Sequence, residues 1–343
     1  MMEIIRNHRF IFIACQLIKF LFLFLCIMKG IVCRIESKDY YVLTDDNKEI
    51  RCVLRGKLKL EAEWKKEKLL YTDLIVVGDI VEFELNDDGT GVIEKIPERK
   101  NYLSRKAPVI KGVSEKGRRF EQIIAANIDY TFCVVSVDKP KFNNRTLDRM
   151  LVTAESCETI PVIVINKYDL LKKKKRDFWY ELYTTLGYKV IRTSTITSQG
   201  IEEIKSLIQN KTSVFIGHSG VGKSSILNLL DPRINQKVGD VSEIWNKGRH
   251  TTVTVRLFKL NENTFVIDTP GVKEIEPYGL TREDITHFYK EISIVSRKCK
   301  FNTCTHTHEP DCAVKKAVED EIIPYERYDS YLRLVETLEE DKY

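Results

Sequence analysis

The sequence lacks a strong excess of charge of either sign. Its 343 residues include 55 Lys and Arg against 50 Asp and Glu, a formal net charge of +5. This excess is too small to indicate nucleic-acid binding by itself. The chain also lacks internal repeats, and its 43% of hydrophobic residues excludes a disordered or low-complexity protein. Its length corresponds to two or three domains of roughly 100–200 residues each.

A disulfide framework is missing as well. The chain has nine cysteines, an odd number, and is far too long for a small disulfide-rich secreted scaffold. Six of the cysteines are scattered, whereas Cys299, Cys304 and Cys312 lie close together. We expect a cytoplasmic protein with reduced thiols.

One long hydrophobic run is present, at residues 10–27. Its length is near that of a membrane span, but Gln16 and Lys19 interrupt it and no small-residue cleavage site follows. One interpretation is a signal anchor. We favour the other: translation starts at Met28, and residues 1–27 are a mis-called extension, because the rest of the chain requires reduced thiols. No stable membrane partner is then expected.

Residues 29–97 are predicted to form an all-β unit. Short β-rich runs are followed by a typical hairpin turn at 86–91. Five short strands in about 70 residues suggest a small barrel of the OB type, although strand counting does not separate it from other small barrels. A β-module without a binding role is an equally good interpretation.

A basic connector follows at residues 98–120. Such a run is usually a solvated linker, but beside an OB barrel it is also a candidate surface for nucleic-acid phosphates. Its basic residues are Arg99, Lys100, Arg105, Lys106, Lys111, Lys116, Arg118 and Arg119.

From residue 129 onward, short apolar runs alternate with helical stretches. The runs at 130–137 and 162–165 are typical of strands that are buried on both faces. This alternation predicts an α/β fold with a mostly parallel sheet and helices on both faces. After Pro277 we expect helices, a loop rich in Cys and His, and a final acidic helix.

The segment 217–224 fits the phosphate-loop pattern Gly-x4-Gly-Lys-Ser in full, between an apolar strand and a predicted helix. Its glycines let backbone N–H groups surround phosphate oxygens at the positive end of a helix. Lys223 can reach the β and γ phosphates, and the Ser224 hydroxyl can bind Mg²⁺. The alternative is a purely structural turn. The expected nucleotide contacts are Gly217, His218, Ser219, Gly220, Val221, Gly222, Lys223, Ser224 and Ser225.

A second phosphate-side element is predicted at the sequence Asp-Thr-Pro-Gly, which ends another strand. Asp268 is placed to hold Mg²⁺ through water, and the Gly271 backbone to sense the γ-phosphate. Asp-x-x-Gly alone is a common turn, so this interpretation depends on the phosphate loop. Thr251 or Thr252 is expected to complete the Mg²⁺ shell, and the pattern does not choose between them.

A guanine-reading motif, Asn-Lys-Tyr-Asp, follows the strand at 162–165. The Asp169 carboxylate can accept from guanine N1–H and from the 2-amino group, a donor pair that adenine lacks. Lys167 would lie along the base, and Asn166 would tie this loop to the phosphate loop. A backbone contact to guanine O6 is expected near Ser194. An isolated turn of this sequence also arises by chance.

The order of these motifs is unusual, because the guanine motif precedes the phosphate loop. Ordinary small GTPases have the opposite order, so the chain is predicted to be circularly permuted. With this order it resembles the RsgA/YjeQ family of ribosome-biogenesis GTPases over roughly residues 28–325. The resemblance implies an N-terminal OB barrel, a permuted P-loop GTPase core and a C-terminal zinc-binding helical domain. It also implies GTP hydrolysis that the small ribosomal subunit stimulates during its late maturation.

A fourth motif supports the resemblance independently. The spacing Cys-x4-Cys-x-His-x5-Cys suits one closed, tetrahedral, structural Zn²⁺ site. His308 is a competing ligand, but His306 matches the spacing of the family, so His308 is set aside. Three unrelated core cysteines are the alternative. The expected ligands are Cys299, Cys304, His306 and Cys312.

The chain departs from common GTPase patterns in two places. Val272 stands where many small GTPases carry the Gln that orients the attacking water, and no Gln is nearby. The resemblance points to His250 for that role, and a loop histidine without catalytic duty is the alternative. The second departure, Thr195 after Ser194 instead of the more usual Ala, concerns only the O6 contact.

We therefore expect a monomeric, GTP-specific hydrolase that acts as a checkpoint on the small ribosomal subunit. GTP would order the switch, and hydrolysis to GDP and phosphate would release the protein. The barrel and connector would contact rRNA. Two rivals remain: an rRNA-binding module with a slow nucleotide switch, and a membrane-anchored GTPase. The expected units are the barrel at 28–97, the connector and GTPase domain at 98–273, and the zinc-binding domain at 274–343.

Overall fold

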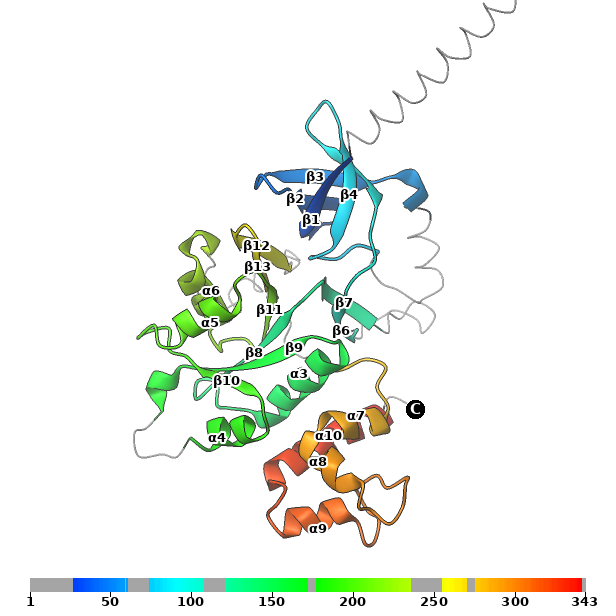
Figure 1. Cartoon of the computed structure of the whole chain (residues 1–343), viewed down its shortest axis with the longest axis vertical. Coiled ribbons are helices and arrows are strands. Elements are labelled where there is room, and N and C mark those ends of the chain that lie inside the picture. Colours follow the sequence, from blue (N-terminus) through cyan, green and yellow to red (C-terminus); the bar gives the residue numbers. More distant parts are fainter. Residues whose placement is uncertain are drawn as a thin grey trace, which may run out of the picture.

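The computed structural model describes most of the chain in three units along its longest axis, with a barrel at one end, an α/β sheet in the middle and a helical unit at the other end (Figure 1). None of the helices in this described part has the length and apolar character that a membrane crossing requires. Of the hydrophobic run at 10–27, only Ile27, the first residue of a strand, belongs to it. The described residues are 27–58, 60, 74–107, 121–171, 177–235, 255–269 and 275–340.

The N-terminal unit is a closed five-stranded barrel, as the sequence predicts. Its strands pair in the order β1-β2-β3-β5-β4, and β4 pairs with β1 to close the ring. Alternate residues point inward, so that in β3 Cys52 and Leu54 are buried while Arg51 is exposed. The strands are β1 (Ile27–Glu36), β2 (Asp39–Leu43), β3 (Glu49–Leu54), β4 (Ile80–Leu85) and β5 (Gly91–Lys95).

The central sheet has the order β10-β9-β8-β11-β13-β12. Its first five strands run parallel and β12 is antiparallel to β13, which agrees with the mostly parallel sheet that the apolar runs predict. The strands are β8 (Tyr130–Ser136), β9 (Ile160–Asn166), β10 (Lys189–Arg192), β11 (Thr212–Ile216), β12 (Arg256–Asn261) and β13 (Thr264–Asp268).

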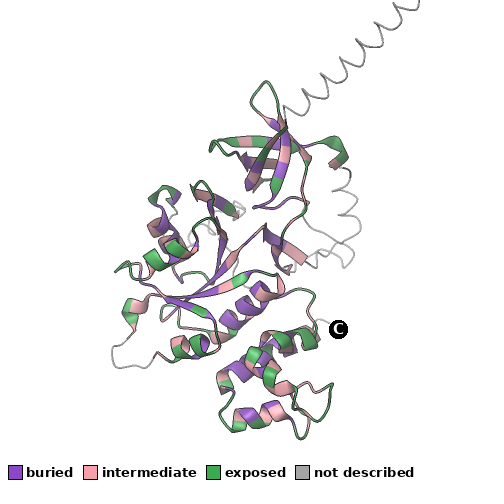
Figure 2. Cartoon of the chain, viewed as in Figure 1, coloured by how far each residue is buried: buried purple, intermediate pink, exposed green. Residues whose placement is uncertain are grey.

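Two helices cover each face of this sheet, and their inward sides are buried (Figure 2). Leu147 and Tyr183 belong to the core on one face, and Ile204 and Leu227 to the core on the other. The helices of the first face are α3 (Asn144–Ser156) and α4 (Phe178–Thr185), and those of the second are α5 (Ile201–Leu207) and α6 (Lys223–Leu230).

Part of the predicted connector is ordered structure rather than a linker. Strand β6 (Tyr102–Lys106) pairs with β7 (Glu121–Ala126) in a two-stranded sheet. Upstream of it, the Arg99 guanidinium donates to both carboxylate oxygens of the buried Asp79, at 2.6 and 2.8 Å. Arg99 therefore ties the connector to the barrel. Four of the connector's basic residues, Lys111, Lys116, Arg118 and Arg119, lie outside the described residues.

The barrel joins the central sheet through backbone contacts. Strand β1 pairs with β12 at Arg34 and Arg256, so the two sheets are continuous. The barrel also contacts the two-stranded sheet, where the Ala126 N–H of β7 donates to the Val77 carbonyl at 2.9 Å. Gly78 follows Val77, and a Cβ there would lie 2.3 Å from the Ala126 oxygen. Only glycine therefore permits this close approach of the two backbones.

The C-terminal unit is helical, as expected after Pro277. Helix α10 packs against α3 of the central unit and against α7. A capping box starts α7, because Thr281 and Asp284 exchange side chain-to-backbone hydrogen bonds. The helices are α7 (Arg282–Phe288), α8 (Lys290–Ser296), α9 (Ala313–Glu319) and α10 (Tyr325–Glu340).

A buried charge cluster joins this unit to the central one. The Arg327 guanidinium on α10 donates to Asp148 on α3 and, at 2.6 Å, to Glu291 on α8. The Tyr183 hydroxyl donates to the same Asp148 oxygen at 2.7 Å. Burial opposes the charge on Arg327, but the two carboxylates raise its pKa above the ordinary value. These contacts hold α10 against α3 of the central unit and against α8 of its own unit.

Replacing Arg327 by Ala should destabilise the protein strongly. The change leaves the Asp148 and Glu291 carboxylates buried without their cation, at a cost of roughly 3–5 kcal/mol. Urea unfolding followed by circular dichroism measures the loss. Arg333→Ala on the same helix is the control, because its pairs are half-exposed and contribute at most about 1 kcal/mol. Equal, small losses in both variants would show that the cluster does not hold the units together.

Candidate nucleotide and metal sites

The phosphate loop connects β11 to α6 as the pattern predicts. Gly217 and Gly222 have φ angles of 152° and 100°, and a Cβ on Gly222 would lie 2.2 Å from the Asn166 amide nitrogen. His218, Ser219 and Gly220 are exposed and Val221 is buried, while Ser224 and Ser225 are half-buried in the first turn of α6. The loop therefore leaves its exposed edge accessible to a ligand at the N-terminus of the helix.

Lys223 folds back into its own loop. Its ammonium donates to the Gly217 carbonyl at 2.6 Å and to the His218 carbonyl at 3.3 Å. Burial lowers the pKa of Lys223, and the nearby Asp268 carboxylate opposes that shift. Lys223 thus provides a cation inside the loop that the pattern assigns to phosphates.

Asp268 lies at the end of β13, beside β11, and is almost completely buried. Neither carboxylate oxygen has a hydrogen-bond partner among the described residues. Burial raises the pKa of Asp268, and Lys223 opposes this shift. A buried carboxylate without partners is costly, so this arrangement fits a cation, or water bound to a cation, beside the phosphate loop.

Asn166 joins the guanine motif to the phosphate loop. Its amide donates to the Val221 carbonyl at 2.8 Å, and its own oxygen accepts from the Thr193 hydroxyl at 3.0 Å. Asn166 is completely buried at the end of β9. The two loops, which the sequence separates, therefore form one site.

Asp169 is exposed and accessible to a ligand. The Ser194 hydroxyl donates to one of its oxygens at 2.5 Å. The Ser194 N–H donates to the Gln199 carbonyl at 3.2 Å, so Ser194 reaches the guanine loop through its side chain rather than through its N–H. The expected backbone contact to guanine O6 near Ser194 remains a prediction.

Four predicted site residues lie outside the described part of the chain. They are the switch residues His250, Thr251 and Thr252, and the phosphate-sensing Gly271. Their expected roles remain predictions.

Sequence reasoning missed one element of the nucleotide site, the loop between β8 and α3. The Lys167 ammonium donates to the Lys139 carbonyl in this loop. Pro140 lies close to the phosphate loop, 3.7 Å from the point where a Cβ on Gly220 would stand. The Lys-Pro dipeptide signals only a turn in the sequence, so its contacts could not be found there.

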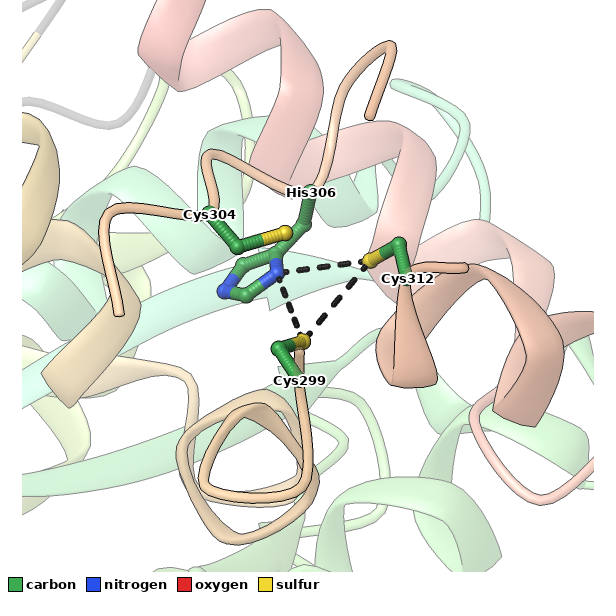
Figure 3. Close-up of side chains that lie close together, drawn as sticks. All are labelled: Cys299, Cys304, His306 and Cys312. Atoms are coloured by element: carbon green, nitrogen blue, oxygen red, sulfur yellow. Dashed lines mark hydrogen bonds between the residues drawn. The ribbon is translucent and has the colours of Figure 1, made fainter. Parts of the chain in front are cut away.

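The predicted metal ligands converge between α8 and α9 (Figure 3). The four ligand atoms of Cys299, Cys304, His306 and Cys312 all lie within 4.8 Å of one another. The Cys299 and Cys312 sulfurs are 3.9 Å apart, and His306 Nδ1 is 3.6 and 3.5 Å from them. A tetrahedral ion about 2.3 Å from each sulfur requires separations of about this size. The cluster could hold a metal ion.

The surrounding residues favour metal binding by His306. Burial lowers the pKa of its imidazole, which favours the neutral form that binds metals. The Tyr328 hydroxyl on α10 donates to the His306 carbonyl at 2.6 Å. The competing His308 is exposed and contacts Thr307 instead.

Glu309 organises the same loop, and the spacing of the ligands gives no sign of it. Its carboxylate accepts from the Thr305 N–H at 2.6 Å and from the Thr307 N–H at 3.1 Å. Burial acts in the opposite direction, but these hydrogen bonds lower the pKa of Glu309 to about 2.

Comparisons with known proteins agree with this architecture. The RsgA GTPase family model matches residues 96–277, and the RsgA N-terminal domain model matches residues 29–93. The "Small ribosomal subunit biogenesis GTPase RsgA 2" of Bacteroides thetaiotaomicron is 37% identical over 319 residues, which is 92% of this chain and 99% of that protein. The Chlorobaculum parvum protein named "Small ribosomal subunit biogenesis GTPase RsgA" is 38% identical and covers 91% and 99%.

Two solved structures are also similar. The crystal structure of YjeQ from Thermotoga maritima has a TM-score of 0.69 and 34% identity, over 91% of this chain and 98% of that one. The structure of YloQ, described as a circularly permuted GTPase, has a TM-score of 0.64 and 31% identity, over 92% and 96%. The predicted permutation is thereby confirmed. The chain belongs to the RsgA family of GTPases.

Proposed function

We propose that this GTPase binds GTP with Mg²⁺ and hydrolyses it to GDP and phosphate on the small ribosomal subunit during late maturation. The observation that supports this most directly is the Asn166–Val221 hydrogen bond, which unites the guanine motif and the phosphate loop. The curated relatives are named for biogenesis of the small ribosomal subunit. A binding module without useful turnover is less well supported, because the chain belongs to a GTPase family.

In the proposed site, this chain's residues bind the phosphates and arrange the charge around them. Lys223 exchanges its contacts with the Gly217 and His218 carbonyls for the β and γ phosphates. Ser224 and the buried Asp268 would hold Mg²⁺, directly and through water. The ion would neutralise charge that develops on the phosphates. His250, Thr251, Thr252 and Gly271 are assigned to the switch by the resemblance alone.

Base selection is proposed to depend on the guanine motif. Asp169 would accept from N1–H and the 2-amino group, and Ser194 orients its carboxylate. Lys167 would lie along the base. A carboxylate acceptor that is held in this way discriminates against bases that lack the two donors.

The cysteine and histidine cluster is proposed to hold one structural Zn²⁺. Three thiolates and one imidazole form a closed ligand set, which leaves no coordination position for catalysis. Through Tyr328, the loop also rests on α10, which packs on the GTPase unit. The metal would therefore brace the helical unit against the nucleotide-binding unit.

The division into units and the partner surfaces are also proposals. We propose a barrel at 28–97, a connector and GTPase domain at 98–273 and a zinc-binding domain at 274–343. The protein would act as a monomer in the cytoplasm. Its barrel and connector would contact rRNA phosphates. Arg99 is paired with Asp79 inside the protein, so other basic residues would make these contacts.

Asp169→Asn should change base preference. The amide places a donor opposite the guanine donors, whereas xanthine offers an acceptor there, so GTP affinity should fall by at least about 100-fold while affinity for xanthosine triphosphate rises. Equilibrium titration with both nucleotides measures the change. Asp87→Asn, in an exposed turn of the barrel, is the control and should leave both affinities unchanged. Equal binding of ATP and GTP by the wild type would refute the guanine assignment.

Cys304→Ser should lower bound zinc well below one ion per chain. It should also destabilise residues 275–343 while GTP affinity stays largely intact, because the metal contributes to folding of its own unit. Elemental analysis and limited proteolysis give the two readouts. Cys157→Ser, which lies outside the cluster, should retain the zinc. Wild-type protein that is fully folded there without zinc would contradict a structural site.

His250→Ala should separate hydrolysis from binding. GTP affinity should stay near that of the wild type, while turnover on small subunits falls by about 10²-fold or more. Lys223→Ala should instead damage binding itself. Single-turnover hydrolysis on purified small subunits, with affinity measured separately, distinguishes the two. His287→Ala, an exposed histidine on α7, is the control. Unchanged hydrolysis in His250→Ala would remove His250 from the mechanism.

A further inference from the structure

The loop between β8 and α3, residues 137–143, contacts both halves of the nucleotide site. On the guanine side, its Lys139 carbonyl accepts from the Lys167 ammonium. On the phosphate side, Pro140 lies closest to the position of a Cβ on Gly220. None of the nucleotide motifs includes this loop. Its place between two of them nevertheless lets it influence how Lys167 is held.

The two residues that make this contact both have left-handed backbones. Lys139 has a φ of 53° and Lys167 a φ of 57°. Residues with a side chain rarely adopt this conformation, and it persists only where the surroundings enforce it. The contact between them therefore joins two segments whose conformations other interactions must maintain.

Packing holds the ends of the loop, since Val137 packs against the core and the Phe142 ring stacks on Trp179 with the ring centroids 4.6 Å apart. Its middle is less well packed. A cavity of about 140 Å³ lies between the loop, the phosphate loop and α3. Its lining includes Ser136, Pro140 and Asn143 from the loop region, and His218 and Val221 from the phosphate loop. An open volume supplies no packing contacts to the residues that line it, so polar contacts contribute more at Pro140 than at the packed Phe142.

The Ser136 side chain supplies such a contact. Its hydroxyl donates to the Pro140 carbonyl at 2.6 Å, and the residue is almost completely buried at the end of β8. In the β8–β9 register, Ser136 stands beside Asn166, which binds the phosphate loop. The Val137 N–H also donates to the Asn166 carbonyl at 3.0 Å. The Ser136 hydroxyl therefore extends an existing anchor at the end of the sheet to Pro140 in the middle of the loop.

We propose that Ser136 is a positioning residue for guanine-nucleotide binding. Its hydroxyl holds the loop, and the Lys139 carbonyl then holds the Lys167 ammonium, so that the Lys167 side chain is already ordered along the base position. A lysine side chain that is ordered in advance loses less rotamer freedom when the nucleotide binds. This inference rests on the proposed GTP-binding function and assigns a specific source of affinity within it.

A double-mutant cycle on the full-length chain tests the proposal, with GDP affinity as the readout. Ser136→Ala alone should weaken GDP binding about tenfold, the scale of one lost hydrogen bond to a buried group. In a Lys167→Ala background, the same change should weaken it less than about twofold, because the group that Ser136 positions is already missing. Thermal unfolding without nucleotide checks that each variant is folded.

Thr131→Val is the matched control. It also removes a buried hydroxyl from β8, but at the far end of the strand, where Thr131 contacts Thr159 at 2.7 Å. It should leave GDP affinity within about twofold of the wild type even if it lowers stability.

Three outcomes would overturn the inference. An unchanged affinity in Ser136→Ala would do so, as would an equal loss with and without Lys167, or a loss in Thr131→Val as large as that in Ser136→Ala. The proposed function survives each of these as long as the wild type binds GDP. Wild-type protein that binds no guanine nucleotide would instead remove the proposed function, and the inference with it.

Discussion

The hydrogen bond from the Asn166 amide to the Val221 carbonyl decides where the two halves of the nucleotide site stand. The two residues are 55 positions apart in the sequence, and each ends or follows a different buried strand. Asn166 is fully buried, and Thr193 satisfies its other polar atom, so its orientation is held on both sides. Gly222 allows the approach, because any side chain there would overlap the Asn166 amide.

The permuted order is compatible with this contact, because a parallel sheet brings the carboxyl ends of its strands to one edge whatever their order in the chain. What the permutation changes is where the chain enters and leaves the sheet. The barrel meets the sheet through β1 and β12, and the helical unit packs on α3. The nucleotide site therefore lies in a unit that contacts a packed neighbour on each side, rather than in an isolated GTPase domain.

Helix α10 connects the C-terminal helical unit to the central unit. Neighbouring residues on this helix contact different units: Arg327 donates to Asp148 on α3, and Tyr328 donates to the backbone of His306 in the Cys/His cluster. The Tyr331 hydroxyl contacts the adjacent Thr305 carbonyl. The helix thus contacts both the loop of the Cys/His cluster and the GTPase unit within two turns.

The sequence by itself determined the elements that local patterns encode. Strand alternation predicted the barrel, the order of two short motifs predicted the permutation, and the spacing from Cys299 to Cys312 predicted the cluster of ligands. Each of these depends on residues within one strand, loop or turn, where the period of the backbone sets which side chains meet.

Only the tertiary structure decided which distant residues support those elements. The roles of Ser136, Arg327 and Glu309 could not be read from the chain, because a serine, an arginine or a glutamate is usually a solvated residue. Strand β6 within the connector could not be predicted either, because its pairing partner β7 lies beyond the basic run. Hydrogen-bond partners and burial arise when elements pack, and local sequence carries no record of which carbonyl or carboxylate will lie within 3 Å.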